Sequence, residues 1–451
     1  MTAKRPPSER YAGLLAGALA VWAVVSAIGL TAVLGHDEAA FAISARGDAP
    51  ETGWLYRSAG TVALARLGFA IGSAPWQLRL PVAGLNLLFV VAVFALGRAA
   101  FGARTGAWAA AVLAGAHPLV FRSAELLSDI PAATCVVAGL AVVVGELERS
   151  DGPRWRIAAS APLFAAGFYL RYGSAPIVGF ALAAAAILWR RAVIRRPGPM
   201  CAAIALLALL IAPHLAWSRA ATGSPLGILS ISSGMPRRAY VGEGLVTYLT
   251  SNPFAFYGAL VAPVMIAGLI GAFRSDRIAS RFLAIVAVGQ VVALGIQSHG
   301  QPRYVFVAVA LLVIVGVDTL ARSRFARPRW ALALVAASWL GVAICAPIYF
   351  RMRDDLFAQV VQAAAALRAD SGGRPCAAFA VNVAQLQWYS GCTVNAVKFS
   401  DSLPSDRVAY AVSFARWPLD IAGVSADLHC AATALVTRDA RAKVWRLKAL
   451  P

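Results

Sequence analysis

Residues 11–34 read YAGLLAGALAVWAVVSAIGLTAVL, and they are followed directly by Gly35-His36-Asp37-Glu38. The first run carries no charge and is long enough, as a helix, to cross the ~30 Å hydrocarbon core of a bilayer. A histidine and two adjacent carboxylates therefore stand where the membrane meets water. Adjacent carboxylates repel, and a nearby low-dielectric medium makes that repulsion more costly, so such a pair tends to bind a cation or a proton. The pattern predicts a membrane helix that ends at a candidate site.

The whole chain has the composition of an integral membrane protein. Of its 451 residues, 60% are hydrophobic and only 14% are charged, and the mean hydropathy is +0.69. A soluble domain carries about 25% charged residues. The formal net charge is +20, but the arginines lie in short gaps between apolar runs rather than on one basic face, so we expect no nucleic-acid partner. We expect the first run to be a retained helix, because it is too long for a signal peptide and no cleavage site follows it.

Eleven apolar segments predict about eleven transmembrane helices, at residues 11–34, 81–101, 106–120, 129–146, 157–170, 174–190, 200–218, 253–273, 281–297, 304–321 and 330–349. Taken alternately, the gaps on one side of these segments hold nineteen Lys and Arg residues and those on the other side hold ten. Because basic residues gather on the cytoplasmic side, the N-terminus is predicted inside and the C-terminal tail outside.

Two external stretches are longer than turns need to be. Residues 35–80 form a large first loop that mixes aromatic and basic side chains, which is typical of an element in the plane of the headgroups. Residues 219–252 are rich in Gly and Pro, which indicates an irregular, flexible loop. We therefore expect a transmembrane domain over residues 1–349 with these two external loops.

Residues 350–451 have a different character. A helical pattern at 354–370 is followed by β-prone runs at 376–382, 393–399, 408–414 and 432–437. This order predicts a small extracytoplasmic α/β domain. Disulfides are permitted outside the cell; Cys376 and Cys392 flank one strand-plus-helix unit and are the favoured pair, with Cys430 left over, although three pairings are open.

Charged residues on the external side gather at one depth. Arg79, Asp129, Arg171 and Arg303 stand at the ends of helices there, together with Asp37 and Glu38. Guanidinium groups pair bidentately with phosphate, so this lining is typical of a site for an anionic lipid headgroup. An alternative is a divalent-metal site made by His36, Glu38 and His299, whose nitrogen and oxygen atoms are suitable ligands but whose spacing matches no motif.

The order of several short motifs resembles a known family. An acidic pair follows the first helix, and Arg79-Leu80-Pro81 opens the next one. They are followed by His117-Pro118, by Ser128-Asp129-Ile130-Pro131 and, late in the chain, by Arg303-Tyr304. Over residues 11–320 this pattern is similar to that of the GT-C superfamily of integral-membrane glycosyltransferases. The branch it resembles includes the protein O-mannosyltransferases and the aminoarabinose transferases that act on lipid A.

The resemblance implies transfer of a sugar from a polyprenyl-phosphate donor to an acceptor hydroxyl outside the cytoplasm, with inversion. It makes Asp37 the base or the group that orients the acceptor, with Glu38 as its partner and Asp129 as a second acidic position. It assigns Arg79 and Arg303 to the donor phosphate, and the depth of Arg171 adds that residue to the set. The acceptor is a glycolipid, a cell-wall glycan or a protein, and the implied location is the cell (inner) membrane, with the site facing the periplasm or exterior. The resemblance leaves open whether a divalent metal is needed.

Two other classes of function compete with this interpretation. A transporter or flippase of a lipid-linked anionic substrate would show internal repeats and ionisable residues near the middle of the bilayer. A scaffold would not explain the acidic pair or the common depth of the arginines. The chain shows no repeat between its halves, and its charges lie at the outer interface, so we favour the transferase.

Overall fold

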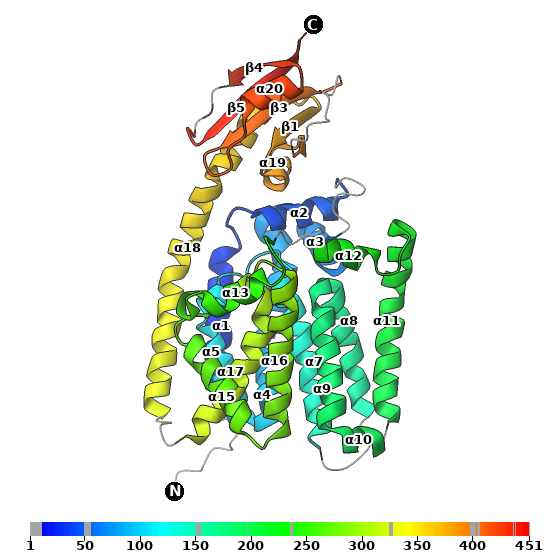
Figure 1. The fold of residues 1–451 in the computed structure, drawn as a ribbon. Coiled ribbons are helices and arrows are strands. Elements are labelled where there is room, and N and C mark those ends of the chain that lie inside the picture. Colours follow the sequence, from blue (N-terminus) through cyan, green and yellow to red (C-terminus); the bar gives the residue numbers. More distant parts are fainter. Residues whose placement is uncertain are drawn as a thin grey trace.

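The structure is a computed structural model that describes residues 11–48, 56–149, 155–195, 197–234, 238–323, 328–396, 403, 406–435, 437 and 439–450. It consists of a helical bundle with a small α/β domain at one end (Figure 1). Parts of the predicted loops (residues 49–55 and 235–237) and of two predicted strands (397–399 and 436) lie outside the described residues.

Seven helices among the described residues are long and apolar enough to cross a membrane, which makes this a multi-pass membrane protein. They are α1 (Ala12–Gly29), α4 (Pro75–Phe101), α7 (Asp129–Leu147), α11 (Gly198–Thr222), α16 (Ile278–Gln297), α17 (Phe306–Arg322) with the preceding 3₁₀ turn η4 (Pro302–Val305), and α18 (Pro328–Ser371).

Shorter helices complete the bundle and the connections at the end opposite the α/β domain. They are α5 (Ala103–Ala114), the 3₁₀ turn η2 (Trp155–Ala159) that leads into α8 (Ser160–Leu170), η3 (Tyr172–Ser174) that leads into α9 (Ala175–Leu188), α10 (Arg190–Arg195) and α15 (Val261–Arg274). Each of the eleven predicted apolar segments contains a helix. Several of these helices are shorter than a membrane-crossing helix, so eleven crossings and the orientation of the chain in the membrane stay predictions.

The two predicted external loops contain helices at the end of the bundle where the α/β domain lies. The first holds α2 (His36–Arg46) and α3 (Ala59–Ile71), and α4 already begins at Pro75 rather than at residue 81. The second holds α12 (Gly227–Gly234) and α13 (Glu243–Thr250); α6 (His117–Val120) and α14 (Pro253–Tyr257) are further short helices. Figure 1 shows α2 lying across the end of the bundle, between the helices and the α/β domain. Both stretches therefore contribute helices to this end of the bundle, and the second, for which an irregular loop was predicted, is helical at α12 and α13.

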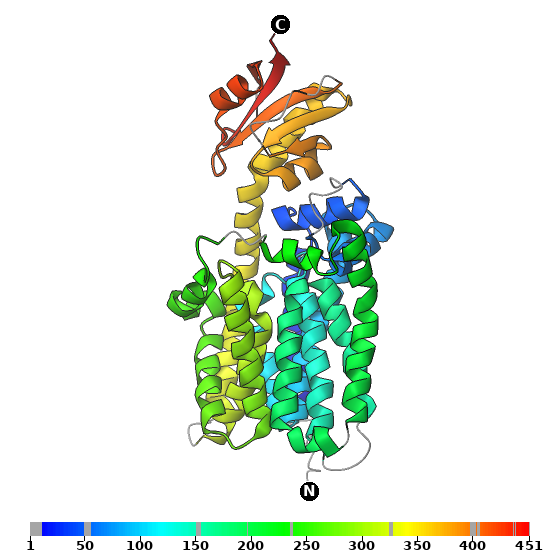
Figure 2. The ribbon, with the colours of Figure 1, turned by 45° about the vertical axis from the view of Figure 1, so that its right-hand side comes forward.

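The α/β domain begins without a break in the chain. Helix α18 continues for 44 residues from the bundle into this domain, as both views of the ribbon show (Figures 1 and 2). The division predicted at residues 349 and 350 thus falls inside one helix. At 1.5 Å per residue, such a helix is roughly 65 Å long, so one continuous helix joins the two parts.

A five-stranded sheet forms this domain, in the order β2-β1-β3-β5-β4. Its elements are β1 (Cys376–Ala380), α19 (Val383–Ser390), β2 (Thr393–Asn395), β3 (Val408–Phe414), α20 (Ile421–Asp427), β4 (Cys430–Leu435) and β5 (Ala442–Ala449). Strand β1 is parallel to β2 and β3, whereas β5 is antiparallel to β3 and β4. The favoured disulfide, Cys376–Cys392, is present, and Cys430 is a free, buried thiol.

Candidate functional site

A cavity of about 970 Å³ lies between the end of the bundle, α2 and α12. Seven parts of the chain line it: the first half of α2, residues 56–58 before α3, residues 127–129 at the start of α7, residues 171–176, residues 226–233 around α12, residues 294–304 between α16 and α17, and Val381 between β1 and α19. Six of them belong to the end of the bundle that faces the α/β domain, and Val381 belongs to the α/β domain itself. The cavity is therefore assembled from segments that are far apart in the sequence.

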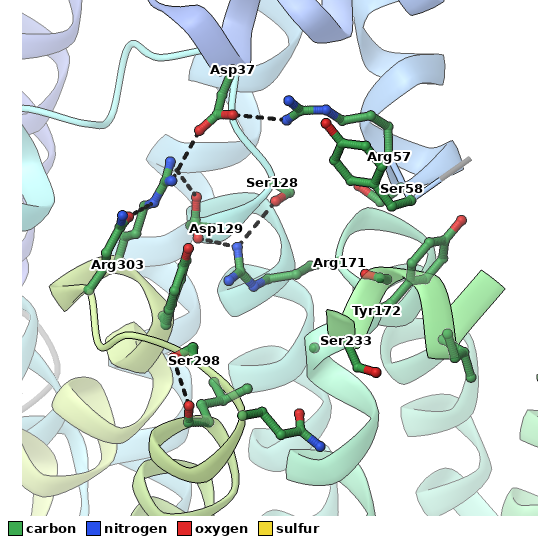
Figure 3. Close-up of a pocket in the computed structure, with 18 of the residues that line it drawn as sticks. Asp37, Arg57, Ser58, Ser128, Asp129, Arg171, Tyr172, Ser233, Ser298 and Arg303 are labelled. Atoms are coloured by element: carbon green, nitrogen blue, oxygen red, sulfur yellow. Dashed lines mark hydrogen bonds and ion pairs between the residues drawn. The ribbon is translucent and has the colours of Figure 1, made fainter. Parts of the chain in front are cut away.

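Five charged side chains alternate in sign along one wall of the cavity (Figure 3). Both oxygens of Asp37 accept from arginines, Oδ1 from Nη1 of Arg57 and Oδ2 from Nη2 of Arg303, each at 3.0 Å. Asp129 lies behind them, with Oδ2 at 4.0 Å from Nη1 of Arg303 and Oδ1 accepting from Arg171. Three guanidiniums and two carboxylates leave a net charge of one positive unit on this wall.

The ring of Tyr304 and the side chain of Gln301 hold two of these arginines in place. The guanidinium carbons of Arg171 and Arg303 lie 4.7 and 5.5 Å from the ring centroid of Tyr304, at cation–π distance. Nε of Arg303 donates to Oε1 of Gln301 at 2.6 Å, and Gln301 in turn contacts His299. The arginines are thus preorganised before any ligand is bound.

Asp37 and Glu38 are neighbours in the first turn of α2 but face different surroundings. Acidic residues are favourable there because the N-terminus of a helix carries a partial positive charge. Successive side chains on a helix point about 100° apart, so Asp37 faces the cavity and Glu38 faces the protein interior. The side chain of Asp37 is 34% exposed, whereas that of Glu38 is only 2% exposed.

Glu38 and Arg79 form a buried ion pair away from the cavity. Glu38 accepts from Nε and Nη2 of Arg79 at 2.8 and 2.9 Å, from Arg353 of α18, and from the backbone N–H groups of Gly35 and Leu126, each at 2.7 Å. The fully buried Arg79 also donates to carbonyl oxygens between α1 and α2, namely those of Gly29, Leu30, Ala32 and Val33.

The geometry therefore changes two of the roles expected from the sequence. Neither Glu38 nor Arg79 lines the cavity. Their side chains form hydrogen bonds with each other and with backbone groups of the segment that connects α1 to α2. We reassign both from contact with substrate to holding α2 in place.

The arginines also set the ionisation of the two carboxylates in α2. Burial by itself would raise the pKa of Asp37, but the guanidiniums of Arg57 and Arg303 outweigh it and hold the pKa well below its ordinary value. Burial opposes ionisation of Glu38 as well, and Arg79 and Arg353 lower its pKa to about 2. Both groups are carboxylates at neutral pH.

Comparison with known proteins agrees with this arrangement. Residues 59–217 match the family model described as dolichyl-phosphate-mannose-protein mannosyltransferase. The crystal structure of ArnT from Cupriavidus metallidurans in the apo state superposes with a TM-score of 0.73 at 16% identity, over 96% of this chain and 97% of that one. The crystal structure of the same protein bound to undecaprenyl phosphate superposes with a TM-score of 0.72 at 16% identity, over 98% of each chain.

The chain has the fold of the GT-C membrane glycosyltransferases.

More distant GT-C structures match as well. AglB, the oligosaccharyltransferase of Archaeoglobus fulgidus, was solved in complex with an inhibitory peptide and a dolichol-phosphate. It superposes with a TM-score of 0.53 at 12% identity, over 88% of this chain and 69% of that one. The arabinofuranosyltransferase AftD from Mycobacteria superposes with a TM-score of 0.53 at 14% identity. The match covers 99% of this chain and 40% of the AftD chain. No curated protein sequence matches the chain.

The alternative metal site on this GT-C fold is not assembled. Nδ1 of His36 is hydrogen-bonded to Asn382, Nε2 of His299 contacts Gln301, and Glu38 is held by its arginines. In the part of the chain that the structure describes, no three His, Cys, Asp or Glu side chains gather as a metal would require. The predicted ligands therefore do not form one site.

Sequence reasoning missed two parts of the cavity. Arg57 looked like one of several arginines in a long loop, and nothing in its local sequence pointed to Asp37, twenty residues before it. A polar, uncharged wall was missed as well, made by Ser230, Ser232 and Ser233 of α12. Only the tertiary fold brings these residues opposite the charged wall.

Proposed function

We propose that this protein transfers a sugar from a polyprenyl-phosphate-linked donor to an acceptor hydroxyl, at the membrane face where the α/β domain lies. One observation carries the proposal: Arg57, Arg171 and Arg303 share a cavity with two carboxylates at the end of an apolar bundle. The positive-inside bias of the sequence makes this face extracytoplasmic.

The charge of the wall suits the donor. A polyprenyl-phosphate sugar is a phosphodiester with one negative charge, and the wall carries one net positive charge. The leaving polyprenyl phosphate gains further negative charge as the bond to the sugar breaks. Preorganised guanidiniums stabilise charge that develops in this way, so the leaving group needs no general acid.

The uncharged residues that line the cavity suit the isoprenoid chain of the donor and the hydroxyl groups of a sugar or acceptor. Leu226, Leu229 and Leu294 offer apolar surface beside the arginines, as an isoprenoid chain requires. The serine wall of α12 (Ser230, Ser232 and Ser233) offers uncharged hydroxyl groups, which suit a sugar or another hydroxyl-rich acceptor. A glycolipid or cell-wall glycan fits this wall, and a protein acceptor is the other class to test.

Asp37 is the carboxylate nearest to the open cavity, and we assign it to the acceptor hydroxyl. Its two oxygens accept hydrogen bonds from Arg57 and Arg303. A donor phosphate that binds Arg57 would release one oxygen of Asp37 to accept a hydrogen bond from the acceptor, while Arg303 stays paired with the other oxygen. Binding of the donor thus prepares the site for the acceptor.

The test uses purified protein in lipid nanodiscs. Labelled undecaprenyl-phosphate-linked hexoses and pentoses are offered together with cell-envelope extract from cells that lack this gene. We expect wild type to transfer one of these sugars and Arg303→Gln to be slower by about a hundredfold or more, the cost of losing one electrostatic donor. Arg281→Gln is the matched control, because Arg281 is a half-exposed arginine at the opposite end of the bundle.

Two results would contradict the proposal. If Arg303→Gln transfers as fast as Arg281→Gln, the charged wall is not the donor site. If wild type binds an undecaprenyl-phosphate sugar but never consumes it, the protein is a lipid carrier rather than a transferase.

A further inference from the structure

His36 lines the cavity beside Asp37 and is held from the α/β domain. Its Nδ1 lies 2.9 Å from Oδ1 of Asn382, which directly precedes α19. Asn382 and Gln385 are 4% and 0% exposed. Buried amides at these positions must satisfy their hydrogen-bonding groups within the protein, so the direction of each bond can be worked out.

The backbone carbonyl of Leu34 fixes the direction of these hydrogen bonds, because a carbonyl oxygen can only accept a hydrogen bond. Nε2 of Gln385 donates to this oxygen at 2.6 Å. Oε1 of Gln385 is therefore the atom that accepts from Nδ2 of Asn382, also at 2.6 Å. Asn382 then presents its Oδ1 to His36, and an oxygen acceptor requires the hydrogen to be on Nδ1 of the imidazole.

This chain of bonds determines the tautomer of His36. A neutral imidazole with its hydrogen on Nδ1 has a lone pair on Nε2, which can accept a proton. Among the described residues, no hydrogen bond to Nε2 of His36 is present. His36 is exposed and lines the cavity, so its Nε2 is accessible to a ligand.

Asp37 is less suited to taking a proton. Both of its oxygens contact guanidiniums, and these hold its pKa well below the ordinary value. A general base works best when its pKa lies near the operating pH, and imidazole is the side chain that meets this condition most often. The carboxylate is better placed to orient the acceptor by accepting its hydrogen bond.

We propose that His36 is the catalytic base of the sugar transfer and that Asn382 and Gln385 are positioning residues that keep the hydrogen of the neutral ring on Nδ1. The proposal rests on the transferase function above and adds which residue takes the proton of the acceptor hydroxyl. Nε2 takes the hydrogen of the acceptor hydroxyl, and the acceptor oxygen bonds to the anomeric carbon. The bond from that carbon to the phosphate oxygen breaks with its electron pair, so an imidazolium and a polyprenyl phosphate with one more negative charge are produced.

Chemical rescue tests the base. His36 is exposed to the cavity, so His36→Ala leaves room for added imidazole. We expect His36→Ala to lose about a hundredfold or more in transfer rate, the usual contribution of a general base, and to regain part of that rate when imidazole is added. His429→Ala, which removes an exposed histidine from the α/β domain, is the control and should gain nothing from imidazole.

Two substitutions of Asn382 test its positioning role. Asn382→Asp keeps an oxygen acceptor for Nδ1 of His36 but introduces a buried charge, whereas Asn382→Leu keeps the shape and removes the acceptor. We expect Asn382→Asp to unfold at the lower temperature and yet to be the faster enzyme. A purely structural role predicts the same order for stability and activity.

The outcomes separate the two proposals. If wild type transfers sugar and His36→Ala keeps the wild-type rate, or is slow without any rescue by imidazole, His36 is not the base while the transferase function stands. If Asn382→Leu is faster than Asn382→Asp, the positioning role fails. If wild type transfers none of the donors, the proposed function fails and this inference fails with it.

Discussion

At the scale of single residues, Asp37 and Glu38 show what the sequence can and cannot predict. The end of an uncharged run placed both at the membrane boundary, and the arginines at the same depth were correctly expected near carboxylates. The sequence did not separate their roles, because the direction of each side chain depends on where α2 begins. His36 begins that helix, which turns Asp37 toward Arg57 and Arg303 and Glu38 toward Arg79.

The reassignment of Arg79 predicts a loss of stability. Removing one partner of a buried ion pair leaves the other charge uncompensated and costs about 3–5 kcal/mol. We expect Arg79→Met to lower the unfolding temperature in detergent far more than Arg171→Met, since Arg171 is partly exposed to the cavity. Equal unfolding temperatures of the two variants would contradict the structural role of Arg79.

The competition between Asp37 and phosphate predicts a gain in affinity. Asp37 neutralises Arg57 and Arg303 in the empty cavity, and each partly exposed ion pair is worth up to about 1 kcal/mol. Asp37→Asn should therefore bind undecaprenyl phosphate up to about thirtyfold more tightly than wild type, as measured by calorimetry in nanodiscs. Weaker binding by Asp37→Asn would mean that this carboxylate helps to hold the phosphate rather than competing with it.

At the scale of elements, strand β3 was predicted with its observed bounds, and β1 and β4 to within two residues at each end. Strand β5 was missed because Lys443, Arg446 and Lys448 interrupt its apolar residues. In the sheet those basic residues face outward, while Val444 and Leu447 are buried. Helix α18 was split into two because its polar half follows its apolar half, whereas in the structure the helix continues through Pro347.

The disulfide acts on the site through α19. Cys376 and Cys392 bracket the segment that carries Asn382 and α19. This helix packs on α2: Tyr389 accepts from the N–H of Leu34 at 2.8 Å, and Arg46 lies over the ring of Trp388. The α/β domain therefore supports the helix that bears His36 and Asp37.

Opening this disulfide should loosen both helices. A cross-link that closes a loop of about 15 residues contributes roughly 3 kcal/mol in the chain-entropy account. We expect Cys376→Ser with Cys392→Ser to speed amide hydrogen exchange in α19 and α2. Exchange in α11, at a different part of the bundle, should not change. Unchanged exchange in α2 would show that α19 does not support it.

At the scale of the whole molecule, composition and hydropathy were enough to predict a multi-pass helical protein with a small α/β domain. The resemblance to GT-C proteins was confirmed by the fold and by the match of residues 59–217. The cavity itself could not be predicted, because its walls come from segments as distant as Asp37 and Arg303 and are joined only by the packing of the bundle.

The orientation in the membrane follows from the distribution of Lys and Arg and predicts a tail outside the cytoplasm. A C-terminal fusion to alkaline phosphatase, which is active only outside, should be active in cells, and a fusion to a green fluorescent protein exported in unfolded form should stay dark. The opposite pair of results would put the cavity on the cytoplasmic face and would contradict the proposed site of transfer.

The most direct test of the transferase is sugar transfer from labelled undecaprenyl-phosphate donors by purified wild type and Asp37→Asn, measured side by side. The account predicts that wild type consumes a donor and that Asp37→Asn is slower by about a hundredfold or more, because a misplaced acceptor loses that much rate. If Asp37→Asn transfers sugar at the wild-type rate, the charged wall is not where the reaction takes place.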